Sequence, residues 1–276
     1  MITYGFLFWL FLIGIIVASL QDLKRKEVDD WLNLFLIVAS FSFILLMAFF
    51  EKDATLVFQL GFLTIILFIL MNAFYYGHIF AGGDAKLLFA MTAFFIGLSF
   101  FETLINLGIF ILFLMFSGAL YGIGYSLALY FKNFKKVNEG IKQEFGGIWI
   151  FSLAISGFVL IAVSLINFYF FFLTLFIFVF PLIYVFAKGL EDVSMIKTIS
   201  WKDLREGDWL AQDVVVGNKI IKAKWDGVSN EEIELMKNLK SIKIKDGMPF
   251  VPAFFIAFIS YVFFKNWVLD FLLGAV

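Results

Sequence analysis

The chain has 276 residues, of which 63% are hydrophobic, 21% aromatic and only 16% charged, and its mean hydropathy is +0.99. This composition excludes an ordinary soluble globular protein and indicates a protein with several membrane-spanning helices. The net charge of -1 gives no reason to expect nucleic-acid binding, and the absence of cysteine excludes disulfides and thiolate metal sites.

Long apolar segments follow one another from the start of the chain. A helix needs about 20 apolar residues to cross a hydrocarbon core roughly 30 Å thick. The uncharged stretch 148–187 would make a helix of about 60 Å, so we predict a hairpin of two helices that turns near Asn167. In total we predict eight transmembrane helices, at about 2–20, 31–50, 55–76, 87–101, 103–131, in two halves of 148–187, and from 249 onward.

The distribution of positive charge predicts the orientation. Basic residues concentrate in the cytoplasmic loops of membrane proteins. If the N-terminus lies outside, the cytoplasmic segments hold 19 of the 21 lysines and arginines; these segments are 21–30, 77–86, 132–147 and 188–247. Only Lys52 and Lys265 then lie outside, so we expect a multi-pass protein of the cytoplasmic membrane with both ends outside.

Residues 188–247 have a soluble composition, with 11 basic and 11 acidic residues. Strands are expected at 213–216, 219–224 and 241–245, and Ser229 with Glu232 predicts a capping box at a helix start. The fold class is therefore an all-α polytopic membrane protein with a small α+β cytoplasmic domain before its last helix. We expect a five-helix membrane domain, a basic loop, a helical hairpin, the α+β domain and a last membrane segment, at residues 1–131, 132–147, 148–187, 188–247 and 248–276.

A polar, glycine-bearing break at 77–86 contains the chain's only histidine and a lone carboxylate, Asp84. A charge next to hydrocarbon costs roughly 2.5 to 3.5 kcal/mol at a helix centre, so such an acid is a candidate functional residue. Gly82 and Gly83 are expected to let the backbone pack where a side chain would not fit.

Asp22 is the candidate partner of Asp84. It ends the first helix, and the two helices between them return the chain to the same membrane face. Two carboxyls that share a site cannot both ionise easily, so the pair holds one proton. One member can then activate water while the other donates a proton, which suits hydrolysis.

Other interpretations of these residues remain open. Asp84 alone could be a helix N-cap, and Asp22 alone could be an ordinary boundary residue. A transporter that binds an ion or proton would have acids near the bilayer midplane and broken helices in both halves. A membrane scaffold would instead use the 188–247 domain to bind a cytoplasmic partner.

Asp22, followed by Lys24-Arg25-Lys26, together with Gly82-Gly83-Asp84-Ala85-Lys86, resembles the GxGD membrane aspartyl peptidases, and among them the archaeal prepilin and preflagellin peptidases. The resemblance implies that Asp22 and Asp84 are catalytic and that Gly82, Gly83 and Lys86 support the motif. Alanine stands at position 81, where the motif has its first glycine. No cysteine is present for the zinc-binding region of bacterial relatives, and no metal or organic cofactor is implied.

The resemblance also implies a substrate class. The partners would be precursor proteins with a short basic leader and a hydrophobic helix, cleaved at the cytoplasmic face of the lipid bilayer. Acidic side chains beside Asp22 are expected to attract this leader; they are Glu27, Asp29 and Asp30.

Overall fold

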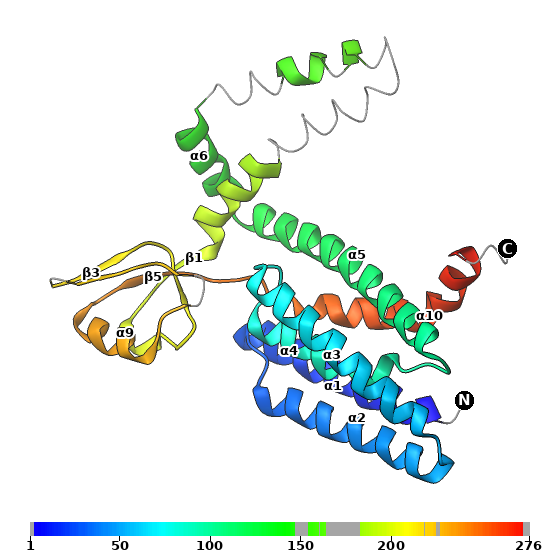
Figure 1. The fold of residues 1–276 in the computed structure, drawn as a ribbon. Coiled ribbons are helices and arrows are strands. Elements are labelled where there is room, and N and C mark those ends of the chain that lie inside the picture. The colour runs from blue at the N-terminus through cyan, green and yellow to red at the C-terminus, as the bar shows by residue number, and fades with distance from the viewer. Residues whose placement is uncertain are drawn as a thin grey trace. The chain divides into compact units, whose positions relative to one another are not determined.

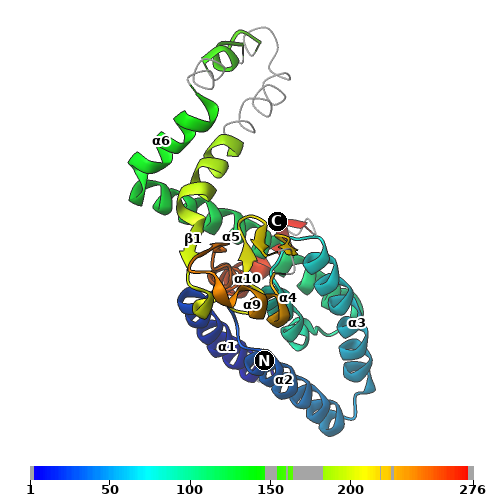
Figure 2. The same ribbon diagram turned by 90° about the vertical axis from the view of Figure 1, so that its left-hand side faces the viewer.

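The computed structural model describes residues 3–146, 154–159, 161–163, 183–217, 219–224 and 227–272. The chain divides into two compact units (Figures 1 and 2). The first unit combines residues 1–123 with residues 248–276, and the second comprises residues 124–247. The end of the chain therefore folds with its beginning, and both candidate aspartates belong to the first unit.

Five described helices are long and apolar enough to cross a membrane. They match five of the predicted spans, and each exceeds the length that a hydrocarbon core requires. Most of the predicted hairpin at 148–187 lies outside the described residues. The five helices are α1 (Thr3–Arg25), α2 (Asp30–Glu51), α3 (Ala54–Tyr76), α5 (Phe100–Lys132) and α10 (Val251–Leu272).

The segment 87–101 does not form the single spanning helix that the sequence predicted. Helix α4 (Gly82–Ala90) is followed by a separate 3-10 helix (Thr92–Phe95). At 1.5 Å per residue, the nine residues of α4 cover only about 14 Å. The hydrophobicity of this segment reflects burial inside protein, because most of its apolar side chains are buried; fully buried ones include Leu87, Leu88, Ala90, Met91, Ala93 and Phe95.

Polar groups of α5 stabilise this break. The amide of Asn106 donates to the carbonyl of Phe95 at 3.0 Å, and the backbone N–H of Gly97 donates to the Thr103 hydroxyl at 2.9 Å. Irregular backbone at membrane depth requires such internal partners, because lipid offers none. The short α4 can therefore end inside the unit, where α1, α2 and α3 contact it or the 3-10 helix.

The second unit contains the predicted α+β fold together with elements that were not predicted. The hairpin β3–β4, helix α9 and strand β5 were expected, as was the capping box of Ser229 and Glu232. Strands β1 and β2, which were not predicted, flank β5 in an antiparallel sheet of order β1-β5-β2. These elements are β1 (Ile196–Ile199), β2 (Trp209–Leu210), β3 (Val214–Val216), β4 (Lys219–Ile221), α9 (Asn230–Leu235) and β5 (Ile242–Lys245).

The basic segment 132–147, predicted as a loop, forms mostly helix. Helix α6 (Phe134–Phe145) buries Val137 and Ile141 against Leu190. The two apolar residues are four positions apart and so lie on one helix face, while the lysines remain on the others.

Helices α1 and α2 approach closely at Gly14. A Cβ atom there would lie 2.6 Å from the Cδ2 of Leu36, so a larger side chain must displace the Leu36 side chain, which is fully buried. We expect Gly14→Val to destabilise the protein by about 1–3 kcal/mol through overpacking. Gly61→Val on α3 is the control, because no atom lies within 4 Å of a Cβ there. Thermal unfolding in detergent checks this, and equal melting temperatures for the two variants would contradict it.

Candidate active site

Asp22 lies in the last turn of α1 and is buried, with 5% of its surface exposed. Its Oδ2 accepts a hydrogen bond from the backbone N–H of Val251 at 2.8 Å. The backbone amide of Phe250 also interacts with this carboxylate. Because α10 begins at Val251, Asp22 acts as a capping group for a helix that lies far along the chain.

Asp84 is the third residue of α4 and is 8% exposed. The N-cap position of α4 is occupied by Ala81, so Asp84 is not the N-cap residue. Asp84 lies outside the five candidate spans. Burial raises its pKa to about 7, the negative charge of Asp22 contributes in the same direction, and a hydrogen bond from the Ala81 backbone opposes them.

The first turn of α10 connects the two aspartate-bearing segments. Phe80, which precedes α4, has its ring centroid 5.4 Å from that of Phe250 and 5.9 Å from that of Phe254. The same turn of α10 donates to Asp22. Asp22 and the segment that carries Asp84 thus both contact the first turn of α10. The negative charge of Asp22 contributes to the raised pKa of Asp84.

The motif glycines are packed less tightly than the sequence predicted. A Cβ at Gly82 would lie 3.6 Å from the ring of Tyr75, and one at Gly83 would lie 3.5 Å from the backbone N of Val28. Both are ordinary van der Waals distances, so a methyl group fits at either position. A side chain that extends beyond Cβ at Gly83 would be directed at the α1–α2 connection.

Lys86 connects α4 to the start of α2. Its Nζ lies 2.6 Å from the Oδ1 of Asp30, and both side chains are substantially exposed. An exposed ion pair contributes little stability, but it fixes the direction in which Lys86 extends. The ion-pair partner of Lys86 is thus Asp30 of α2.

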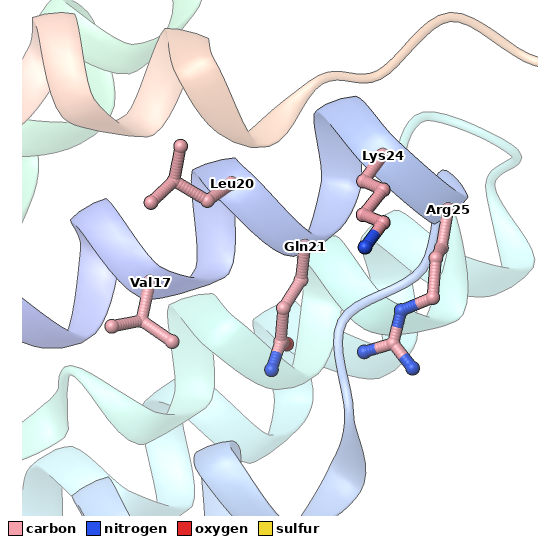
Figure 3. A pocket seen from close by; sticks show the side chains of 5 residues that line it. All are labelled: Val17, Leu20, Gln21, Lys24 and Arg25. Carbon is pink, nitrogen blue, oxygen red and sulfur yellow. The ribbon is translucent and has the colours of Figure 1, made fainter.

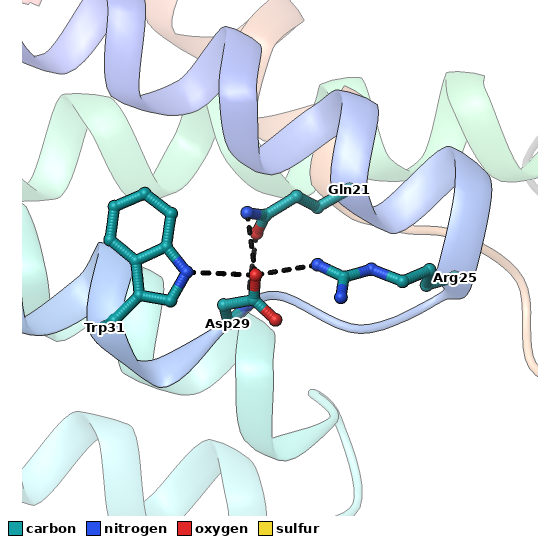
Figure 4. Close-up of polar contacts among 4 residues, drawn as sticks. All are labelled: Gln21, Arg25, Asp29 and Trp31. Carbon is teal, nitrogen blue, oxygen red and sulfur yellow. Dashed lines mark hydrogen bonds and ion pairs between the residues drawn. The ribbon is translucent and has the colours of Figure 1, made fainter.

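Asp29 organises the connection between α1 and α2 (Figure 4). Its Oδ2 accepts hydrogen bonds from Arg25 at 2.7 Å, from Gln21 at 3.0 Å and from the Trp31 indole at 3.0 Å. The hydrogen bonds from Arg25 and Trp31 lower the pKa of Asp29. Sequence reasoning missed Gln21, which also accepts from the Asp29 backbone N–H at 3.1 Å. Glu27, in the same connection, is exposed.

A depression of about 370 Å³ lies beside α1 (Figure 3). It changes from apolar to basic toward the end of the helix, and its lining residues are Val17, Leu20, Gln21, Lys24 and Arg25. Asp22 does not line it, because Ala18 and Asp22 are buried on another face of α1. Among the residues that the structure describes, no group of three or more metal-ligating side chains is found.

The electrostatic interaction between the aspartates is testable by titration. Asp22→Asn removes a negative charge and is expected to lower the pKa of Asp84 below about 7. Infrared difference spectroscopy follows the carboxyl C=O band of Asp84, identified by its loss in Asp84→Asn. The band should disappear at a lower pH in Asp22→Asn than in the wild type, while Asp270→Asn leaves it unchanged. Equal midpoints in Asp22→Asn and the wild type would contradict the interaction.

Comparison with known proteins places the two aspartates inside one family match. Residues 9–130 match the type IV leader peptidase family, a range that includes α2, α3 and α4 with most of α1 and α5. No curated protein and no solved structure matches the chain. The matched range leaves out helix α10 and the part of the second unit that follows residue 130. Residues 9–130, somewhat less than half of the chain, are therefore similar to the type IV leader peptidase family.

Proposed function

We propose that this protein is a membrane-embedded aspartic endopeptidase that removes the basic leader from prepilin-like or preflagellin-like precursors. The observation that carries the proposal is a pair of buried carboxyls, Asp22 and Asp84, within the family-matched range. Their charges interact, as a pair that shares one proton requires. The five apolar helices support a location in a membrane.

The proposed chemistry is general acid–base hydrolysis. One carboxylate removes a proton from water, whose oxygen attacks the carbonyl carbon of the scissile peptide. The carbon–nitrogen bond then breaks, and the protonated carboxyl supplies a proton to the leaving nitrogen. A pKa near 7 makes Asp84 suited to carry that proton at neutral pH. This chemistry needs no metal or organic cofactor.

The substrate is proposed to enter from the lipid as a helix whose leader lies at the cytoplasmic face. Asp22 and Asp84 follow spans that run in the same predicted direction, so water reaches them from that side. The leader is basic, and the nearby acidic side chains of Glu27, Asp29 and Asp30 attract it. Glu27 is exposed, the Asp30 carboxylate is 75% exposed although it pairs with Lys86, and Asp29 accepts three side-chain hydrogen bonds.

Substitution of either aspartate tests the mechanism. Asp22→Asn and Asp84→Asn should each lower the rate of leader cleavage by at least about 10²-fold, because general acid–base catalysis contributes roughly 10²–10⁴-fold. The assay incubates membranes containing the protein with a precursor and sequences the new N-terminus. Asp270→Asn is the matched control, since Asp270 is an exposed acid on α10. Full cleavage by either site variant would exclude this mechanism.

Leader recognition can be separated from chemistry. Glu27→Gln should raise KM by about twofold to threefold at low ionic strength without changing kcat, because exposed charges act weakly and are screened by salt. Glu51→Gln, at the opposite end of α2, should leave KM unchanged. An increase in KM for Glu27→Gln that persists in high salt would contradict an electrostatic contribution to leader binding.

A further inference from the structure

The first turn of α10 offers two backbone donors to the candidate site. Pro249 and Pro252 have no N–H, and the N–H of Ala253 already donates to the Phe250 carbonyl at 2.9 Å. The remaining amides of this turn belong to Phe250 and Val251, and both interact with the Asp22 carboxylate. The order Pro-Phe-Val-Pro therefore leaves the amides of these two residues to bind Asp22.

The first turn of α10 is closely packed within the first unit. A Cβ at Gly118 of α5 would lie 2.7 Å from the Phe250 ring, so the ring occupies the space that this glycine leaves. On another side the ring packs near Phe80. Val251 and Phe254 are fully buried. The position of the two amides is thus determined by contacts with α5 and with the segment before α4.

We propose that the backbone of Phe250 and Val251 is a positioning element that keeps Asp22 as the ionised member of the aspartate pair. Asp22 then removes the proton from water, and Asp84 supplies the proton to the leaving nitrogen. Two features favour the anion at Asp22: charge-assisted hydrogen bonds from amides, and the positive end of a helix. The inference rests on the proposed function, and it assigns part of the site to a helix outside the family-matched range.

Replacing one backbone amide by an ester tests the proposal with little steric change. Incorporating the α-hydroxy analogue of valine at position 251 removes the N–H and keeps the side chain. We expect kcat for precursor cleavage to fall about tenfold or more, because a hydrogen bond to a charged group is lost, while KM stays within about twofold. The control is an ester at position 253, which removes a hydrogen bond to Phe250 instead of one to Asp22.

A second pair of variants displaces the turn through its neighbour. Gly118→Leu should push the Phe250 ring and lower kcat, whereas Gly108→Leu on the same helix should not, since a Cβ at Gly108 meets no atom within 4 Å. Melting temperatures are measured for all variants.

The outcomes separate this inference from the proposed function. If the wild-type protein cleaves no precursor, the proposed function fails. If the wild type cleaves and the ester at 251 leaves kcat unchanged, only the positioning role is overturned. Equal losses of kcat from the esters at 251 and 253 would also overturn it, because they would reflect general destabilisation of the turn.

Discussion

The hydrogen bond between the buried Asp22 carboxylate and the Val251 amide is the interaction on which the site depends. A buried carboxylate requires donors, and the first amides of a helix require acceptors, because burial takes both groups out of bulk water. Each group therefore satisfies the other. The consequence is that the end of the chain is joined to its first helix, and the last helix becomes part of the environment of the first aspartate.

The second aspartate is positioned by an element that is too short to span the membrane. Helix α4 and the following 3-10 helix are packed against longer helices, and two backbone groups at the end of this segment bond to α5: the Phe95 carbonyl to Asn106 and the Gly97 N–H to Thr103. A helix that begins inside protein can place a carboxyl where solvent is largely excluded. This burial is the largest cause of the raised pKa of Asp84, ahead of the charge of Asp22.

The connection between α1 and α2 combines an ordered part with an exposed part. Asp29 is held by Gln21, Arg25 and Trp31, and its low pKa keeps it ionised as the centre of that network. Asp30 and Lys86 join the same connection to α4. Acidic residues that looked equivalent in sequence thus differ in their surroundings, and the exposed ones are the better candidates for contact with a basic leader.

Much of this architecture could be predicted from hydropathy, capping residues and charge. Five spans, the strands around Gly217 and the capping box at Ser229 all follow from local patterns. The pairing of Asp22 with Asp84 stays a prediction that rests on the direction of successive helices. Hydropathy could not distinguish a lipid-exposed span from the buried segment 87–101, because both are apolar and without charged residues. The contact between Asp22 and α10 depended on tertiary structure alone, since a backbone amide carries no sequence signal and its partner is chosen by packing of distant helices.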